Sequence, residues 1–285
     1  MKTIRATCIQ TSGAVLGEGP LWHLNQLWWV DIERREIHAF DPAQTAGRLW
    51  TLPDTVGFIV PRTAGGFLIG LGAKVVEWDP EHGIGRTVAN PEGDSPSTRF
   101  NDAKCDPHGS LWAGTMSLSE QPNRGNLYRI DPSDFQISRM AASVSISNGL
   151  AWSPEGSTMY YIDSATRRVD AFDFDAGKIS NRRCVIELAE GFPDGMCSDR
   201  DGNLWIALWG GWAVVCHDPK TGERIAKIEL PVEAVTSCCF DDRGGLFITT
   251  ASRDLDAKGR ELQPLAGGLF YAASVSVAQP IPSFG

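Results

Sequence analysis

Short apolar runs separated by turns rich in Gly, Asp and Pro follow one another along the whole chain of 285 residues. The clearest run begins with a large apolar residue and continues with Trp, Tyr, Phe or Ile. It occurs six times, at intervals of 40 to 48 residues, at positions 27–31, 67–70, 111–114, 159–163, 204–207 and 246–249. Turn residues such as Asp201-Gly202-Asn203 stand before most copies, which is typical of the second strand of a hairpin.

Six phased repeats of about 40–48 residues, each built from short strands, predict an all-β fold with six propeller blades of four antiparallel strands. Helical solenoids have similar repeat lengths, but no segment here has sustained apolar positions at i, i+3 and i+4. The apolar segment 3–9 precedes the first blade, and we expect it to pair with the last blade and close the ring. Without a linker or low-complexity run, residues 1–285 are predicted to form one β-propeller domain.

Polar residues recur at one phase of the repeat. Four of them lie 9 to 11 residues before the start of their marker run: Glu18, Asn101, Asn148 and Asp194. Equal phase in a repeat means an equivalent position in space, and the first strand of each propeller blade lines the central channel. We therefore expect these side chains to ring one end of the channel, with the small residues Gly57 and Thr236 at the same phase in the other two blades.

Turn-forming residues flank these polar positions, as in Pro193-Asp194-Gly195. Because Pro193 fixes φ and Gly195 permits a close approach, we expect Asp194 on a stiff turn. Oxygen ligands that converge from rigid positions suit one divalent ion, Ca²⁺, Mg²⁺ or Mn²⁺, and can also hold Zn²⁺ or Fe²⁺. The alternative is that the polar groups pair among themselves or cap turns. Arg99 is two residues before Asn101, so it is either a substrate clamp at the channel mouth or a solvated surface residue.

Composition and charge narrow the class of protein. A net charge of −9 leaves no basic face for nucleic acid or for an anionic membrane surface. Residues 1–5 lack the apolar segment of a signal peptide, no apolar run is long enough to span a membrane, and the seven Cys form no C-x-x-C pair. We therefore predict a cytoplasmic protein with reduced thiols, present as a monomer or weak homo-oligomer.

Six ordered motifs resemble the SMP-30/gluconolactonase/regucalcin-like family over essentially the whole chain. They are Leu16-Gly17-Glu18-Gly19-Pro20, Arg99-Phe100-Asn101-Asp102, Ala113-Gly114-Thr115-Met116, Ser147-Asn148-Gly149, Pro193-Asp194-Gly195-Met196 and Thr236-Ser237-Cys238-Cys239-Phe240. The resemblance implies a six-bladed propeller with one divalent metal ion in its channel, and hydrolysis of a sugar lactone to the aldonic acid. It also implies that Glu18, Asn148 and Asp194 bind the metal, that Asp194 is the general base, and that Arg99 and Asn101 contact the substrate.

One stretch departs from the family pattern. Animal members have a substrate-contacting Glu shortly after Gly-Thr-Met, whereas this chain has Ser117-Leu118-Ser119 there, with Glu120 one place late. The sugar preference of the animal members is therefore not carried over.

Two other functions are compatible with the same scaffold: a non-enzymatic calcium-binding or regulatory protein, and a phosphotriesterase-like hydrolase. The absence of a Gly-x-Ser-x-Gly motif counts against a serine esterase.

Overall fold

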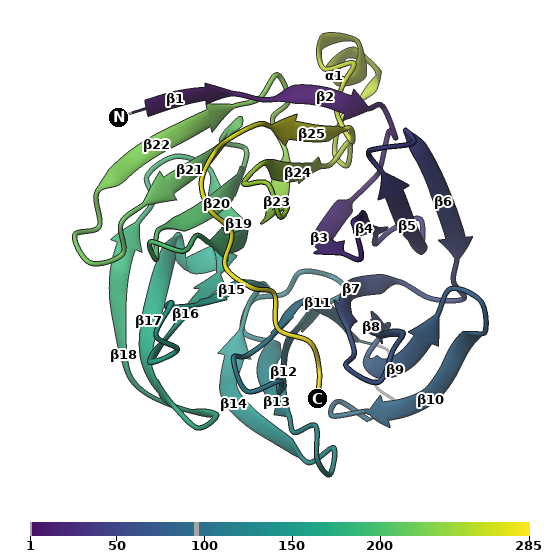
Figure 1. Ribbon diagram of the computed structural model, residues 1–285, viewed down its shortest axis with the longest axis vertical. Helices are drawn as coiled ribbons and strands as arrows, with labels where there is room; N and C mark the ends of the chain where they lie inside the picture. The colour runs from purple at the N-terminus through teal and green to yellow at the C-terminus, as the bar shows by residue number, and fades with distance from the viewer. Residues whose placement is uncertain (1, 94–96) are drawn as a thin grey trace.

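Six β-sheets stand around a central channel in the computed structural model, which describes residues 2–93 and 97–285 (Figure 1). The innermost strand of each sheet lines the channel. These strands are β3 (Gly17–His23), β7 (Val56–Pro61), β11 (Thr98–Cys105), β15 (Ser147–Trp152), β19 (Phe192–Ser198) and β23 (Val235–Phe240). We number the blades 1 to 6 in the order of these strands. The predicted six-bladed propeller is confirmed.

The remaining strands continue each blade outward. The second strands carry the apolar marker runs: β4 (Gln26–Asp31), β8 (Phe67–Leu71), β12 (Leu111–Ser117), β16 (Thr158–Asp163), β20 (Leu204–Trp209) and β24 (Leu246–Thr250). The third strands are β5 (Glu36–Asp41), β9 (Lys74–Asp79), β13 (Gly125–Ile130), β17 (Arg168–Asp175), β21 (Ala213–His217) and β25 (Leu269–Ala272). The fourth strands are β6 (Ala46–Thr51), β10 (Gly83–Ala89), β14 (Ile137–Val144), β18 (Lys178–Glu187), β22 (Arg224–Glu229) and β2 (Thr7–Gln10).

The N-terminal segment closes the ring in two steps. Strand β2 pairs antiparallel with β25 and completes blade 6, which confirms the expected closure. Strand β1 (Lys2–Arg5) instead pairs parallel with β22 and adds a fifth strand to blade 5. The helical elements of the described residues are the 3₁₀ turn η1 (Ser164–Thr166) and α1 (Ala257–Leu262). None of the described helices has the length and apolar character needed to cross a membrane.

Apolar side chains from adjacent blades fill the spaces between the sheets. Between blades 1 and 2, Trp28 packs against Phe67 with ring centroids 4.6 Å apart, and Trp50 and Trp78 join the same aromatic group. Between blades 3 and 4, Trp112 lies edge-on to Trp152. These tryptophans are therefore packing residues between blades. Burial of this kind fixes the angle of each blade and so fixes where each inner strand begins.

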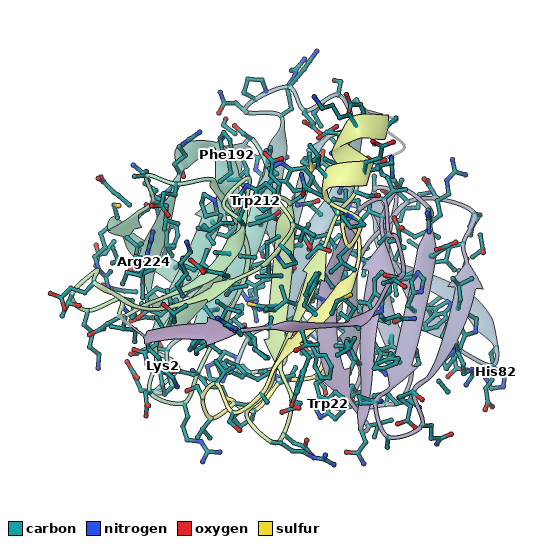
Figure 2. All side chains as sticks on the ribbon, turned by 90° about the horizontal axis from the view of Figure 1, so that it is seen from above. Lys2, Trp22, His82, Phe192, Trp212 and Arg224 are labelled. Carbon is teal, nitrogen blue, oxygen red and sulfur yellow. The ribbon has the colours of Figure 1, made fainter. Side chains whose placement is uncertain are left out.

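The two ends of the channel are distinct. Every inner strand runs in the same direction, so all six begin at one end, which we call the site end. Phe192 at the start of β19 and Trp212 between β20 and β21 lie at this end together with α1, while Trp22 near the end of β3 lies at the other (Figure 2). The C-terminal segment, residues 275–285, crosses the ring (Figure 1). It contacts the turns after β15, β19 and β23 and bonds to residues 61–63 and 109, all at the end opposite the site end.

Candidate active site

The phased polar residues occupy equivalent places on the inner strands. Glu18, Asn101, Asn148 and Asp194 are each 4–7% exposed, which places them within the channel and below its rim. Gly57 and Thr236 hold the same position on β7 and β23. The structure therefore brings the four predicted side chains together at the site end of the channel.

The expectation that Asp194 sits on a turn is wrong. Asp194 lies within β19, and the other three polar residues also lie within inner strands. Proline is tolerated at position 193 because β19 is the inner edge of its sheet, with β20 as its only paired neighbour. Gly195 does permit a close approach: a Cβ there would lie 2.0 Å from Ser237 Oγ on β23. Neighbouring inner strands therefore approach closely at the depth of the site.

A register shift interrupts every inner strand at the site position. In blade 3, Phe100 pairs with Thr115 and Ala103 with Ala113, so Asn101 and Asp102 together face a single residue. The equivalent shifts occur beside Glu18, Asn148 and Asp194, and in blades 2 and 6. Bulges of this kind turn side chains away from strict alternation. The Gly and Pro residues read as turn formers in the sequence are the local signal of these bulges.

A chain of hydrogen bonds joins the site residues of blades 3, 4 and 5. Arg99 Nη1 donates to Asn101 Oδ1 at 2.6 Å, and Asn101 Nδ2 donates to Asn148 Oδ1 at 2.9 Å. Asn148 Nδ2 then donates to Ser164 Oγ at 2.8 Å, and Ser164 Oγ donates to the Pro193 carbonyl at 2.6 Å. The polar groups thus pair among themselves in part, as the alternative reading proposed. Ser164 also fixes the Asn148 amide, so that its nitrogen faces η1 and its oxygen faces Asn101.

Arg99 is a buried residue, with 8% of its surface exposed, so the solvated reading of this residue is wrong. Burial and, after it, the positive charge of Arg253 lower the pKa of its guanidinium to about 10. The acidic groups of Glu18, Glu120 and Glu33 oppose this effect. Arg99 therefore remains a cation at neutral pH and lies among acidic groups of the channel end.

The carboxyl groups of Glu18 and Asp194 are hydrogen-bonded to each other although they belong to blades 1 and 5. Burial and, after it, the Asp102 carboxylate raise the pKa of Glu18 to about 8. Burial and the charge of Glu18 raise the pKa of Asp194 well above its usual range. A buried acidic pair of this kind retains a proton unless a cation replaces it.

The donor set fits a hard divalent cation. Two carboxylates and the oriented Asn148 oxygen are the oxygen ligands that Ca²⁺ and Mg²⁺ favour. No group of three or more His, Cys, Asp or Glu side chains suited to a metal occurs in the described part of the chain. An ion at this place would therefore rely on the asparagine amide as well as on Glu18 and Asp194.

Two carboxylates that the sequence pattern did not single out hold the inner strands in place. Asp31 accepts hydrogen bonds from the backbone N–H groups of Val15 and Leu16, just before Glu18. Asp163 does the same for Ser145 and Ile146, just before Asn148. The signal for these roles was present, because both are the Asp that ends a marker run.

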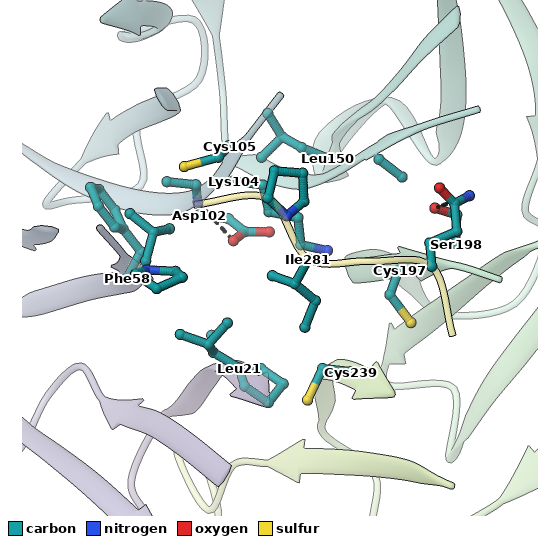
Figure 3. Close-up of a pocket in the computed structure, with 18 of the residues that line it drawn as sticks. Leu21, Phe58, Asp102, Lys104, Cys105, Leu150, Cys197, Ser198, Cys239 and Ile281 are labelled. Carbon is teal, nitrogen blue, oxygen red and sulfur yellow. Dashed lines mark hydrogen bonds between the residues drawn. The ribbon is translucent and has the colours of Figure 1, made fainter. Parts of the chain in front are cut away.

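A cavity of about 140 Å³ continues from the site toward the other end of the channel (Figure 3). Residues further along the inner strands line it, together with residues 279–282 of the C-terminal segment. Asp102 projects into it, and the Oδ2 atom of Asp102 is buried without a hydrogen-bond partner. The Lys104 amino group donates to the Met196 carbonyl. All seven Cys are free thiols in this structure.

Comparison with known proteins identifies the family of this chain. Residues 16–252 match the family model described as the SMP-30/Gluconolactonase/LRE-like region. Regucalcin of Bos taurus is 37% identical over 292 residues, which cover 97% of each chain. The structure of regucalcin from Agrobacterium tumefaciens, described as a calcium-binding protein, has a TM-score of 0.94 at 26% identity, over 100% of this chain and 99% of that one.

A gluconolactonase from Xanthomonas campestris shares the fold at a TM-score of 0.78 and 20% identity, over 94% of this chain and 89% of that one. The family model spans the inner strands that carry all four site residues. The chain therefore belongs to the SMP-30/gluconolactonase/LRE-like family.

Proposed function

We propose that this chain hydrolyses a sugar lactone, of the gluconolactone or pentonolactone type, to the aldonic acid, with the help of one divalent metal ion. Membership of the family supports a lactonase-type hydrolase. The observation that carries the finer proposal is the buried pair of Glu18 and Asp194 beside the oriented amide of Asn148. Close to this pair, Arg99 offers hydrogen-bond donors to a polar substrate, and Asn101, whose Oδ1 atom accepts from Arg99, offers an acceptor.

Glu18, Asn148 and Asp194 would hold the ion, and a bound cation would polarise the lactone carbonyl and stabilise the negative charge that develops on its oxygen. The Asp194 carboxylate accepts the proton of the water that attacks the carbonyl carbon. The ring C–O bond then breaks, and the ring oxygen takes the proton held by Asp194 and leaves as a hydroxyl group. Arg99 Nη1 donates to the Phe100 carbonyl as well as to Asn101 Oδ1, so Nε and Nη2 carry further donors for the sugar hydroxyls.

The experiment is a panel of sugar lactones assayed after exhaustive chelation and after addition of Ca²⁺, Zn²⁺, Mg²⁺, Mn²⁺ or Fe²⁺. Asp194→Asn keeps the size of the side chain and one oxygen but removes the base. Because a general base contributes about 10²–10⁴ in rate, kcat should fall at least about a hundredfold even at saturating metal. Glu18→Gln should instead weaken metal binding and recover part of its activity at high metal concentration.

Asp242→Asn, on an exposed turn at the opposite end of the channel, is the matched control and should leave kcat unchanged. Recovery of near wild-type kcat by metal in Asp194→Asn would make Asp194 a ligand only. Turnover of lactone by protein that elemental analysis shows to be metal-free would remove the metal from the proposal.

The second candidate function is calcium binding without hydrolysis of any lactone. It is favoured by the description of the Agrobacterium tumefaciens regucalcin as a calcium-binding protein. The same site would serve it, so binding measurements alone do not separate the two. Tight Ca²⁺ binding with no hydrolysis of any lactone in the panel would establish this second function in place of the first.

A further inference from the structure

Three charged side chains from three blades meet at the site end of the channel. Arg253 follows β24 of blade 6, and its Nε atom lies 3.0 Å from Glu33 Oε1. Its Nη2 atom lies 2.5 Å from Glu120 Oε1. Glu33 belongs to the turn between β4 and β5 in blade 1, and Glu120 to the loop between β12 and β13 in blade 3. We call Arg253, Glu33 and Glu120 the Arg253 clasp.

The topology puts the clasp on the side of the channel where the site lies. Inner strands begin at the site end and second strands finish there, so each loop from a second to a third strand lies at that end. Blade 2 stands between blades 1 and 3, and its loop is short, with only Gly72 and Ala73 between β8 and β9. The contact from blade 6 to blade 3 therefore passes above the low loop of blade 2.

Arg99 lies within reach of the charges of the clasp. Arg253 lowers the pKa of the Arg99 guanidinium, while Glu120 and Glu33 raise it. Arg99 starts the hydrogen-bond chain that leads through Asn101 to Asn148. The clasp is thus the outer neighbour of the residues proposed to contact substrate. The site residues at the channel end are less than one-tenth exposed.

We propose that the Arg253 clasp is an entrance gate, which restricts the size of the substrate that reaches the metal site. The side chains of Arg253, Glu33 and Glu120 are 31%, 40% and 43% exposed. Ion pairs with this exposure are weak and are screened by salt, so the gate opens readily. When the pair between Arg253 and Glu120 breaks, the loop after β12 is free to move away from blade 6. Glu120 acts here through its pairing with Arg253. The size restriction rests on the proposed lactonase function, whereas the opening of the loop does not.

The test compares wild type with Arg253→Ala, with Glu120→Gln, and with the control Arg243→Ala. Arg243 is an exposed arginine of the same blade at the opposite end of the channel. Hydrogen exchange of the loop after β12 should become faster in both clasp variants, by about threefold or more if each lost pair contributed an ordinary exposed ion-pair energy. In wild type, about 0.5 M NaCl should produce the same change, because it shortens the Debye length to roughly 4–5 Å and so screens the exposed ion pairs. The control should behave as wild type does.

The second readout is the ratio of kcat/KM for a bulky lactone to that for a small one. Arg253→Ala should raise this ratio several-fold, and Arg253→Lys, which keeps the charge but lacks the forked donors, should fall between. Equal exchange rates in wild type and Arg253→Ala would overturn the clasp, and an unchanged ratio would overturn its role as a gate. If wild type hydrolyses no lactone, the proposed function fails, and the rate at which added Mn²⁺ is lost to excess chelator replaces the ratio. A faster loss in Arg253→Ala then supports the gate, and an unchanged loss overturns it.

Discussion

Replacement of Ser164 by alanine tests whether the orientation of the Asn148 amide matters for metal binding. The Ser164 hydroxyl accepts from Asn148 Nδ2 at 2.8 Å and donates to the Pro193 carbonyl at 2.6 Å. Ser164 is 5% exposed, so its removal leaves a buried N–H group and a buried carbonyl without these partners. A buried group left unpaired costs about 1–3 kcal/mol, and rotation of the amide relieves part of the cost. We expect the free energy of unfolding to fall by about 2 kcal/mol.

The same change should act on the metal in a separate way. Loss of a partner that orients a ligand typically lowers metal affinity about 10–100-fold, which corresponds to roughly 1.4–2.7 kcal/mol. Isothermal titration with Ca²⁺ or Mn²⁺ measures the affinity, and thermal unfolding of the metal-free protein measures the stability. Because the hydroxyl does not take part in the reaction, kcat at saturating metal should stay near the wild-type value.

Ser157→Ala is the matched control, since Ser157 is an exposed serine of the same blade whose hydroxyl donates to Glu155. It should change neither quantity. The reasoning would be refuted if Ser164→Ala unfolded at a lower temperature but bound metal as wild type does. In that case Ser164 would support the turn before blade 5 and would have no part in orienting Asn148.

Three further predictions concern pH and the substrate. Because the pKa of Glu18 is raised to about 8 in the metal-free protein, the metal must displace a proton below that pH, and affinity titrations should show tighter binding as pH rises from 6 to 8. Burial lowers the pKa of His38, stacked on Trp29, to about 4, so its neutral form contributes stability that is lost as pH falls from 6.5 toward 4, by at most about 3 kcal/mol. Denaturant titrations should show this loss in wild type and a shallower one in His38→Gln. Arg99→Ala should raise KM while metal occupancy, measured by elemental analysis, stays unchanged; lower occupancy at constant KM would contradict the substrate role of Arg99.

Repetition is what made the fold and the depth of the site readable from the sequence. Six copies of one strand pattern predicted six blades, and the shared phase of Glu18, Asn148 and Asp194 placed them at one end of the channel. The same reasoning misjudged the local backbone, because Gly and Pro beside these residues serve bulges within strands as well as turns. Only the packing of one inner strand against the next distinguishes a bulge within a strand from a turn at these Gly and Pro residues.

Features that do not repeat were not predicted. Ser164 lies in a turn after a second strand, and its role depends on Asn148 and Pro193 from two neighbouring blades. Arg253, Glu33 and Glu120 come from loops of different length that share no phase in the repeat. Strand β1 joins blade 5 through a parallel pairing that its own four residues do not specify. Each of these contacts depends on the three-dimensional closure of the ring.

The pairing of β2 with β25 also sets an order of events during protein synthesis. Residues 7–10 leave the ribosome early, but their partners at residues 269–272 are made more than 250 residues later. Blades 1 to 4 each contain four consecutive strands and have no such delay. The sixth blade is therefore the last to be completed, and in a nascent chain β2 has no β25 to pair with until then. A ribosome-bound chain stopped before residue 269 has an open ring, in which blades 1 and 6 are not joined by this strand pair.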